Sequence, residues 1–172
     1  VQNSTNTVAV KVLDKVTPER SFTFATVNLG LDLVRSEEIN GQVFSDVDYA
    51  PLALGGLTSG LSVLEMTAAY CTFPNQGIYA EPTTYSRVVD SNGKTVLSND
   101  PEYSVAMKEK TAYYMNNLLK NAVDNGTGRI VQIPNMAVAG KTGTTTNDHD
   151  RWFVGYTPYY CAAVWVGYDN QA

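Results

Sequence analysis

Charged side chains are scarce in this sequence, and those present form no cluster of one sign. Asp, Glu, Lys and Arg make up 17% of the 172 residues, whereas about a quarter is usual in soluble domains. The net charge is −5, and no run of Lys and Arg could follow a phosphate backbone. Long acidic runs are missing too. The composition therefore argues against nucleic-acid binding and against a charged, disordered tail.

Cysteine and histidine are also rare. The two cysteines, Cys71 and Cys161, are too few for a disulfide scaffold at this length. Both have apolar neighbours, so we expect two buried thiols. The single histidine, His149, lies between Asp148 and Asp150, but no further His or paired Cys supports a metal site. We therefore expect a solvated loop there, and neither a metal nor another cofactor.

Long apolar runs are the third absence. None reaches the roughly 20 residues that cross a bilayer, so we expect no membrane contact by this segment. The chain opens without a signal peptide and has no disordered lead or tail, so we expect a piece of a larger protein. Apolar residues nevertheless make up 44%, which suits one packed domain or a large part of one.

Helical periodicity and end signals predict four helices, over residues 7–17, 18–29, 62–73 and 109–124. Ser62 and Glu65 form a capping box at the start of the third helix. The fourth helix presents one apolar face, made of Met115, Leu118, Leu119, Ala122 and Val123. Residues 36–60 are rich in turn residues and are predicted to be irregular.

Two groups of strands are predicted. Residues 82–90 and 94–97 flank Ser91-Asn92-Gly93, which is typical of a hairpin turn. Three further strands are predicted over residues 136–144, 151–157 and 160–168. The last two are joined by a connection short enough for an antiparallel pair. Helices come first and an antiparallel sheet comes last, which indicates an α+β fold.

The strand over residues 136–144 contains Lys141-Thr142-Gly143, whose residue types suit one chemical use. The lysine supplies a positive charge, the threonine hydroxyl can bind a carboxylate or pass a proton, and the glycine lets a ligand lie against the backbone. An extended peptide can then pair with the strand. A bare tripeptide of this kind is common in ordinary turns, so the surrounding motifs decide its meaning.

Several motifs do surround this strand. They are Gly126-Thr127-Gly128, residues 150–158 (DRWFVGYTP), residues 164–169 (VWVGYD), Leu54-Gly55-Gly56 and residues 60–70 (GLSVLEMTAAY). With Lys141-Thr142-Gly143-Thr144 they resemble the transpeptidase domain of class A penicillin-binding proteins over nearly the whole chain. The resemblance implies an α+β fold of the penicillin-binding protein transpeptidase or serine β-lactamase type, an antiparallel sheet packed with helices. Residues 1–172 are then expected to be the C-terminal portion of this single domain.

The family's second active-site motif, Ser-x-Asn, matches Ser4-Thr5-Asn6. The resemblance implies that Ser4 relays a proton to or from the leaving group, and that Asn6 binds the amide of the substrate. The motif lies just before the first predicted helix, so residue type alone also permits a second reading, in which Ser4 or Asn6 is a helix N-cap without a catalytic role.

The resemblance also assigns the Lys-Thr-Gly strand to substrate binding. It implies that Lys141 is catalytic, because it provides the electrostatic environment for the terminal carboxylate and helps to poise Ser4, and that the Thr142 and Thr144 hydroxyls bind this carboxylate. The backbone N–H of Thr144 is then one oxyanion donor, and Gly143 permits close approach of the substrate. Trp152 and Trp165 are interpreted as aromatic residues that pack in the core or cover the sheet.

We identify no candidate here for the first motif of the family, a Ser-x-x-Lys that carries the nucleophile, and we expect it upstream of Val1. The implied function is a peptidoglycan D,D-transpeptidase on the extracytoplasmic face of a bacterial membrane. It acts on stem peptides, is acylated by β-lactam antibiotics without a cofactor, and needs the N-terminal part of the domain as a partner. We therefore expect this segment to be inactive alone.

Two alternatives stay open at this point. One is a non-catalytic domain of the same fold that binds or senses β-lactams. The other is a relative of the serine β-lactamases, which the residues around Gly155-Tyr156-Thr157-Pro158 favour less.

Overall fold

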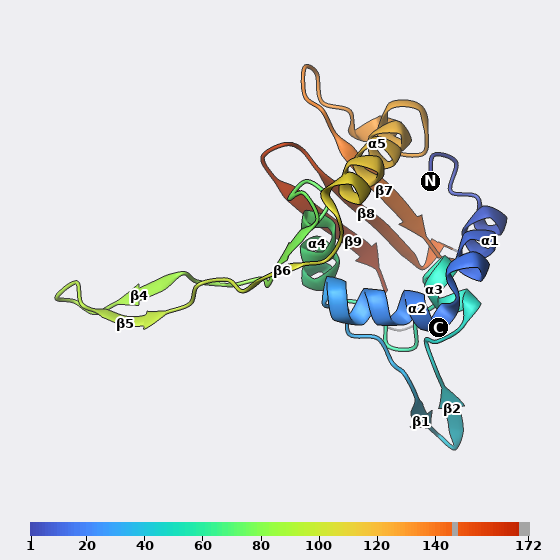
Figure 1. Ribbon diagram of the computed structural model, residues 1–172, viewed down its shortest axis with the longest axis horizontal. Helices are drawn as coiled ribbons and strands as arrows, with labels where there is room; N and C mark the ends of the chain where they lie inside the picture. Colours follow the sequence, from blue (N-terminus) through green and yellow to red (C-terminus); the bar gives the residue numbers. More distant parts are fainter. Residues whose placement is uncertain (146–147, 169–172) are drawn as a thin grey trace.

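A three-stranded antiparallel sheet lies at the centre of the molecule (Figure 1). The computed structural model describes residues 1–145 and 148–168. The sheet has the order β7-β8-β9, with β7 at Ala139–Thr144, β8 at Asp150–Tyr156 and β9 at Cys161–Gly167. All three predicted strands are confirmed, although the first begins three residues later than the range 136–144. The antiparallel sheet and the helices packed on it confirm the α+β prediction.

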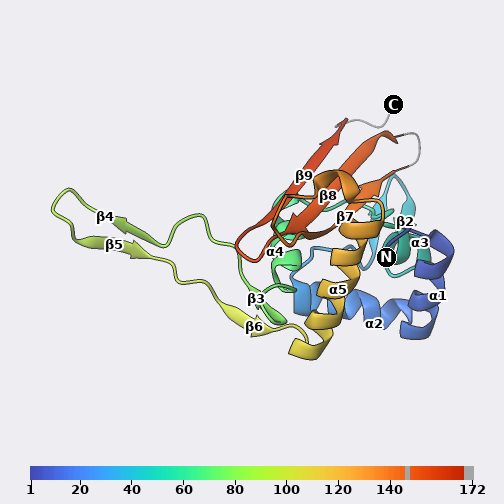
Figure 2. The same ribbon diagram turned by 90° about the horizontal axis from the view of Figure 1, so that it is seen from above.

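The two faces of this sheet differ in their surroundings. Figure 2 shows α4 and α5 on one side of the sheet, and both helices contact its strands. Side chains along β9 alternate accordingly, with Cys161, Ala163 and Trp165 partly buried toward the helices. On the opposite face Val164 and Val166 are 55% and 65% exposed. The structure therefore has two layers, and the outer face of the sheet is open.

The two helices on this sheet are α4, Val63–Cys71, and α5, Glu109–Asn125. Both confirm predicted helices. The capping box is confirmed as well, because the Ser62 hydroxyl accepts the Glu65 N–H while the Glu65 carboxylate accepts the Ser62 N–H. The buried face of α5 consists of Ala112, Leu119, Ala122 and Val123. Leu118 was predicted on this face but is 47% exposed, since it lies about 100° around the helix from Leu119.

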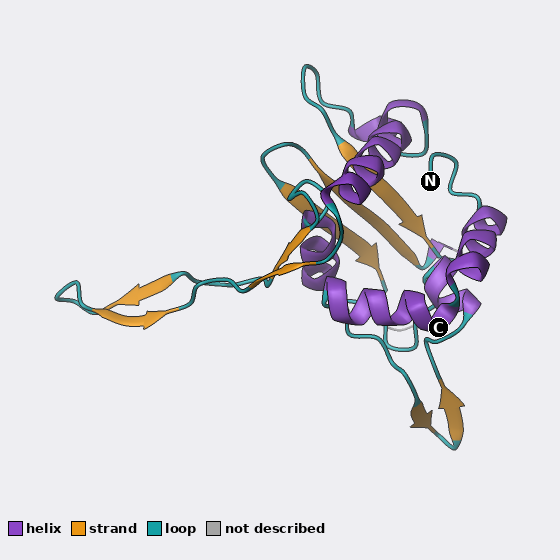
Figure 3. Cartoon of the chain, viewed as in Figure 1, coloured by secondary structure: helices purple, strands orange, loops and turns teal. Residues whose placement is uncertain are grey.

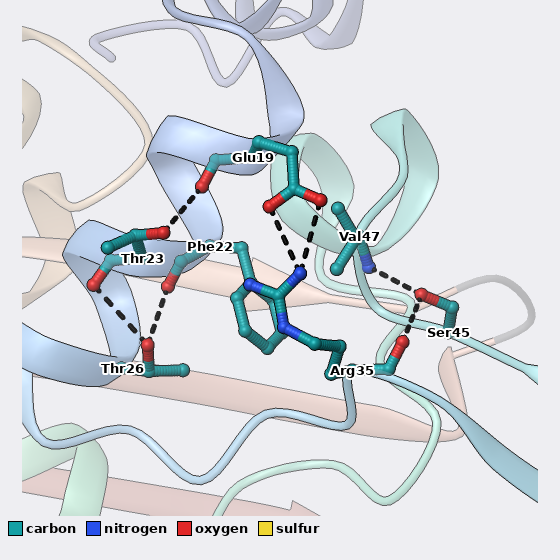
Figure 4. A network of polar contacts seen from close by, with 7 residues as sticks. All are labelled: Glu19, Phe22, Thr23, Thr26, Arg35, Ser45 and Val47. Carbon is teal, nitrogen blue, oxygen red and sulfur yellow. Dashed lines mark hydrogen bonds and ion pairs between the residues drawn. The ribbon is translucent and has the colours of Figure 1, made fainter.

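The chain begins with α1, Asn6–Val16, and α2, Pro18–Thr23, which continues as one π-helical segment over Phe24–Asn28. Both predicted helices are confirmed. Figure 4 shows how α2 holds the segment that follows it. The Arg35 guanidinium contacts the Glu19 carboxylate at 3.1 Å and stacks over the Phe22 ring at 4.5 Å. An exposed ion pair adds little stability, so the stacked ring and the buried part of Phe22 contribute more to this contact.

The prediction that residues 36–60 are irregular is wrong. They form a hairpin, β1 at Glu37–Ile39 and β2 at Gln42–Phe44, followed by the short helix α3, Tyr49–Leu54. Asn40 and Gly41 have φ values of 53° and 79°. Two consecutive positive φ angles at Asn-Gly define the type I′ turn that suits a two-residue hairpin. The signal was therefore in the sequence, hidden among the other turn residues.

The buried carboxylate of Asp46 organises the rest of this segment. Its side chain is 1% exposed. It accepts hydrogen bonds from the Val34 N–H at 2.8 Å and from the N–H and hydroxyl of Thr58, at 2.7 and 2.8 Å. These donors satisfy the carboxylate in the absence of a cation, so Asp46 joins the two ends of the segment.

A two-stranded arm projects from the body of the molecule (Figures 1 and 2). It carries β4, Arg87–Val89, and β5, Thr95–Ser98. This confirms the predicted hairpin, although its first strand is shorter than expected. A second pair at the base of the arm, β3 at Ile78–Ala80 with β6 at Tyr103–Val105, was not predicted. Figure 3 shows that loops connect the two pairs.

A single 3₁₀ turn, Arg129–Val131, lies between α5 and β7. Within residues 1–145 and 148–168, none of the helices has the length and apolar character needed to cross a bilayer.

Candidate active site

The N-terminal segment meets the middle of β7. The Lys141 side-chain nitrogen donates a hydrogen bond to the Ser4 hydroxyl at 2.9 Å, and it donates a second to its neighbour's carbonyl, Thr142 O, at 2.7 Å. Lys141 points to the helix-covered side of the sheet, while Ser4 lies in the loop just before α1. The fold thus brings together one residue from each of two motifs predicted to be catalytic.

The environment of Ser4 does not match that of a helix cap. The N-cap of α1 is Thr5, which makes no capping hydrogen bond through its side chain. Ser4 precedes it with a φ of 50°, in the left-handed region that costs about 1–2 kcal/mol for a residue with a Cβ. Its hydroxyl is exposed and bound to Lys141. The alternative reading, in which Ser4 serves as the N-cap, is therefore wrong.

Asn6 is the first residue of α1, and its side chain is exposed. It lies inside the helix rather than at the N-cap position, so the N-cap reading fails for this residue too. Asn6 thus lies two residues after Ser4, in the first turn of α1, and of the two motif residues it is Ser4 that contacts β7.

Burial lowers the pKa of the Lys141 ammonium below its usual range, because removing water penalises the charged form. Lys141 takes part in none of the ion pairs formed within the described part of the chain. Its proton is therefore easier to release than that of a solvated lysine. A lysine of this kind in contact with a serine hydroxyl can exchange a proton with that hydroxyl.

The remaining motif residues line the outer edge of β7, which has no strand beside it in this sheet. The Thr145 N–H binds the Asp150 carbonyl at 3.1 Å. Because hydrogen-bonded and non-hydrogen-bonded pairs alternate in an antiparallel ladder, the N–H groups of Thr142 and Thr144 point away from β8. An extended ligand at this edge would find two backbone donors.

The neighbouring strand also explains why position 143 is glycine. Gly143 pairs with Trp152 in the register of β7 and β8. A Cβ at Gly143 would meet the Trp152 Cβ at 3.3 Å, a tight contact that one of the two strands would have to relieve by a small shift. Trp152 in turn pairs with Trp165, whose indole N–H donates to Asp150 at 3.0 Å. Both tryptophans are partly buried and cover the helix-facing side of the sheet, as predicted.

One residue with a functional position was not singled out from the sequence. Thr127 lies in the loop after α5, and its hydroxyl oxygen accepts a hydrogen bond from the Thr142 hydroxyl at 3.0 Å. The sequence contained a signal for it, because Gly126-Thr127-Gly128 was one of the motifs carrying the family resemblance. Its contact with β7 appears only in three dimensions.

The Ser-x-x-Lys spacing occurs once in the sequence, at Ser91-Asn92-Gly93-Lys94, which corrects the expectation that the sequence offers no candidate for this motif. These residues form the turn between β4 and β5 at the tip of the arm, where Asp90 accepts the N–H groups of Asn92 and Lys94. A helix would place a serine and a lysine at this spacing on one face. Figure 1 shows the arm far from β7, so this serine cannot act there.

Cys71 and Cys161 are each only partly buried, which corrects the prediction of two buried thiols. They come from α4 and β9, which pack together. The Cys161 thiol also lies 3.6 Å from the Thr67 carbonyl, one turn before Cys71. A hydrogen bond from Cys161 lowers the pKa of the Cys71 thiol to about 7. The pKa of Cys161 is raised for the same reason.

His149 is partly buried beside the start of β8. Residues 1–145 and 148–168 contain no group of three His, Cys, Asp or Glu side chains placed to hold a metal ion.

Comparison with known proteins identifies the class to which this fold and site belong. A family model described as the penicillin-binding protein transpeptidase domain matches residues 1–171. The chain therefore belongs to the penicillin-binding protein transpeptidase family, which confirms the resemblance drawn from its motifs.

Individual relatives agree with this assignment. The chain is 40% identical over 168 residues to penicillin-binding protein 1A of Clostridium acetobutylicum, covering 97% of this chain and 20% of that protein. It thus spans about a fifth of the length of this curated relative. A D,D-transpeptidase domain from Eggerthella lenta superposes with a TM-score of 0.70 at 26% identity, over 91% of this chain and 44% of that one.

The same fold occurs in penicillin-binding protein A from M. tuberculosis, solved as an imipenem acyl-enzyme complex. That structure matches with a TM-score of 0.64 at 20% identity, over 84% of this chain and 36% of that one.

Proposed function

We propose that this chain is the substrate-binding portion of a serine-type D,D-transpeptidase, which crosslinks peptidoglycan stem peptides on the outer side of a bacterial cell membrane. The observation that carries the proposal is the 2.9 Å contact between Lys141 and Ser4 beside the open edge of β7. It joins the Ser-x-Asn and Lys-Thr-Gly motifs in a chain that belongs to the penicillin-binding protein transpeptidase family.

Each motif residue then has a role in the transfer of an acyl group. Ser4 carries a proton between the nucleophile and the leaving amine, and Lys141 sets the charge around Ser4. Asn6 binds the substrate amide, and the Thr142 and Thr144 hydroxyls bind the terminal carboxylate. The Thr144 N–H, which points to the open edge, stabilises the oxyanion and contributes about 3 kcal/mol to lowering the barrier.

The reaction proceeds through a covalent intermediate. A serine attacks the carbonyl between the two terminal D-alanines, forms an ester and releases D-alanine. An amine of a second stem peptide then attacks the ester and restores the serine. A β-lactam enters the same path but leaves a slowly hydrolysed ester. The imipenem complex of the M. tuberculosis protein with this fold supports this last step.

We place the nucleophile outside these 172 residues, in the remaining part of the transpeptidase domain. The sequence contains a single Ser-x-x-Lys, and its position at the tip of the arm supports this view. The exposed valines on the outer face of the sheet, Val164 and Val166, offer an apolar surface for that remaining part. The segment alone is then inactive.

The test is the rate at which a fluorescent penicillin acylates the full-length protein. Lys141→Ala should lower the second-order rate constant at least about 100-fold, as for loss of an electrostatic catalytic group, while the melting temperature of the domain changes little. Lys11→Ala, which removes an exposed positive charge from α1, is the matched control. Equal losses of rate and stability in Lys141→Ala would show a structural lysine and contradict the proposal.

The same labelling separates this function from its alternatives. Rapid release of hydrolysed penicillin would identify a β-lactamase. A stable adduct on a protein that does not crosslink stem peptides would identify a sensor domain.

A further inference from the structure

The Gly126-Thr127-Gly128 loop connects the two ends of the proposed site. Its central residue contacts β7 on one side, because the Thr127 hydroxyl accepts the Thr142 hydroxyl at 3.0 Å. On the other side the Thr127 N–H donates to the backbone carbonyl of Gln2 at 3.3 Å. Gln2 lies two residues before Ser4. One threonine thus bridges the strand that carries Lys141 and the segment that carries Ser4.

This close approach requires glycine at position 126, and a tight contact with α5 favours glycine at position 128. A Cβ at position 126 would lie 2.3 Å from the Gln2 carbonyl oxygen, and one at position 128 would lie 3.2 Å from a Val123 methyl group. The first distance is impossible without movement of the backbone. The glycines therefore let the loop pack between the N-terminal segment and the end of α5, with the threonine held in place between them.

The side chain of Gln2 holds the other end of this bridge. Its amide nitrogen donates to the Asn125 carbonyl at 3.1 Å, one of the carbonyls that the end of α5 leaves without a helical partner. Its amide oxygen accepts from Asn121 at 2.9 Å. The N-terminal segment is therefore held to α5, which packs on β7, and Ser4 acquires a set position relative to Lys141.

We infer that Thr127 is a positioning residue that orients the Thr142 hydroxyl toward the carboxylate of the ligand. The inference rests on the proposed function and extends it by one residue. The Thr142 hydroxyl has one hydrogen to donate. Because Thr127 is a fixed partner, the Thr142 side chain adopts a defined rotamer at the open edge of β7. On ligand binding that hydrogen turns to the carboxylate, and the Thr127 hydroxyl, itself a donor, supports the Thr142 oxygen.

A positioning role predicts a loss that depends on the carboxylate of the ligand. The measurement is the second-order acylation rate of the full-length protein by a penicillin and by its methyl ester, which has no negative charge. Thr127→Val keeps the shape of the side chain but removes the hydroxyl. We expect it to reduce the preference for the free acid about tenfold, the value of one hydrogen bond, without lowering the melting temperature. Thr127→Ser should retain most of the preference.

The control is Thr95→Val, the same substitution on β5 of the distant arm, which should leave both rates unchanged. An equal loss with acid and ester in Thr127→Val would show a structural role and overturn the inference, and so would unchanged rates or a wild type that reacts equally with both compounds. A wild-type protein that reacts with neither compound would instead refute the proposed function, and the inference would fall with it.

Discussion

At the scale of single residues, Cys71 and Cys161 show how a neighbour changes the chemistry of a side chain. Each thiol alone would be a small, inert core residue. Their contact lowers the pKa of Cys71 to about 7 and raises that of Cys161, because one thiol donates a hydrogen bond to the sulfur of the other. The partly buried Cys71 is therefore the reactive member of the pair.

We expect the rate of Cys71 alkylation by iodoacetamide to rise with pH around a midpoint near the pKa of about 7. Cys161→Ala removes the donor and should move this midpoint to higher pH, whereas Cys161→Ser keeps a donor and should move it less. Mass spectrometry of the modified peptides measures both rates. An unchanged midpoint in Cys161→Ala would contradict the assigned cause.

At the scale of elements, one tyrosine links the sheet to both of its helices. The Tyr156 hydroxyl on β8 donates to the Asn116 side chain on α5 at 2.6 Å. Asn116 in turn donates to the Phe73 carbonyl, just after α4, at 3.0 Å. Tyr156 is 6% exposed and packs with Leu119 and Ala139. These two hydrogen bonds thus help to fix how α4 and α5 lie on the sheet that contains β7.

Tyr156→Phe should lower the free energy of unfolding by about 1 kcal/mol at neutral pH, the value of one hydrogen bond. Burial raises the pKa of Tyr156 above its usual range and that of Tyr70 to about 12. Each tyrosine makes its full contribution to the free energy of unfolding below pH 10, which is near its pKa in the unfolded chain. That contribution is lost as the pH rises through the raised pKa of the folded protein. The melting temperature of the domain, measured in the full-length protein from pH 7 to 11, should therefore fall above pH 10. It should fall less steeply in Tyr156→Phe. A parallel decline in both proteins would contradict this.

At the scale of the whole molecule, the exposed face of the sheet and the position of the arm both bear on where the nucleophile lies. The helices cover one side of β7, β8 and β9, and the valines on the other side remain exposed. The one serine with the Ser-x-x-Lys spacing lies at the tip of the arm, away from Lys141. Under the proposed function, the described part of the segment offers the ligand-binding strand, and the nucleophile comes from elsewhere in the protein.

Penicillin labelling of the full-length protein, followed by peptide mapping, should place the adduct outside these 172 residues. The isolated segment should accordingly stay unlabelled, and Ser91→Ala in the full-length protein should label at the wild-type rate. An adduct on Ser4 or Ser91 would show that this segment carries its own nucleophile.

The sequence was sufficient for features that depend on near neighbours. The capping box at Ser62, the helix over α5 and the Lys141-Thr142-Gly143 strand could be recognised because propensity, capping and periodicity act over a few residues. Asn40-Gly41 belongs to the same group, although it was overlooked. Leu118 was predicted on the buried face of this helix and is exposed, because the width of a buried face depends on what packs against the helix.

Tertiary structure alone decided which distant residues meet. Ser4 and Lys141 lie 137 positions apart, and local pattern contains no information about a contact at that separation. The bridge from Thr142 through Thr127 to Gln2, and the pairing of Cys71 with Cys161, have the same origin. Packing α5 against β7 places the loop after α5 and the N-terminal segment beside β7, and packing α4 against β9 brings the two cysteines together, because each helix buries its apolar face against the sheet.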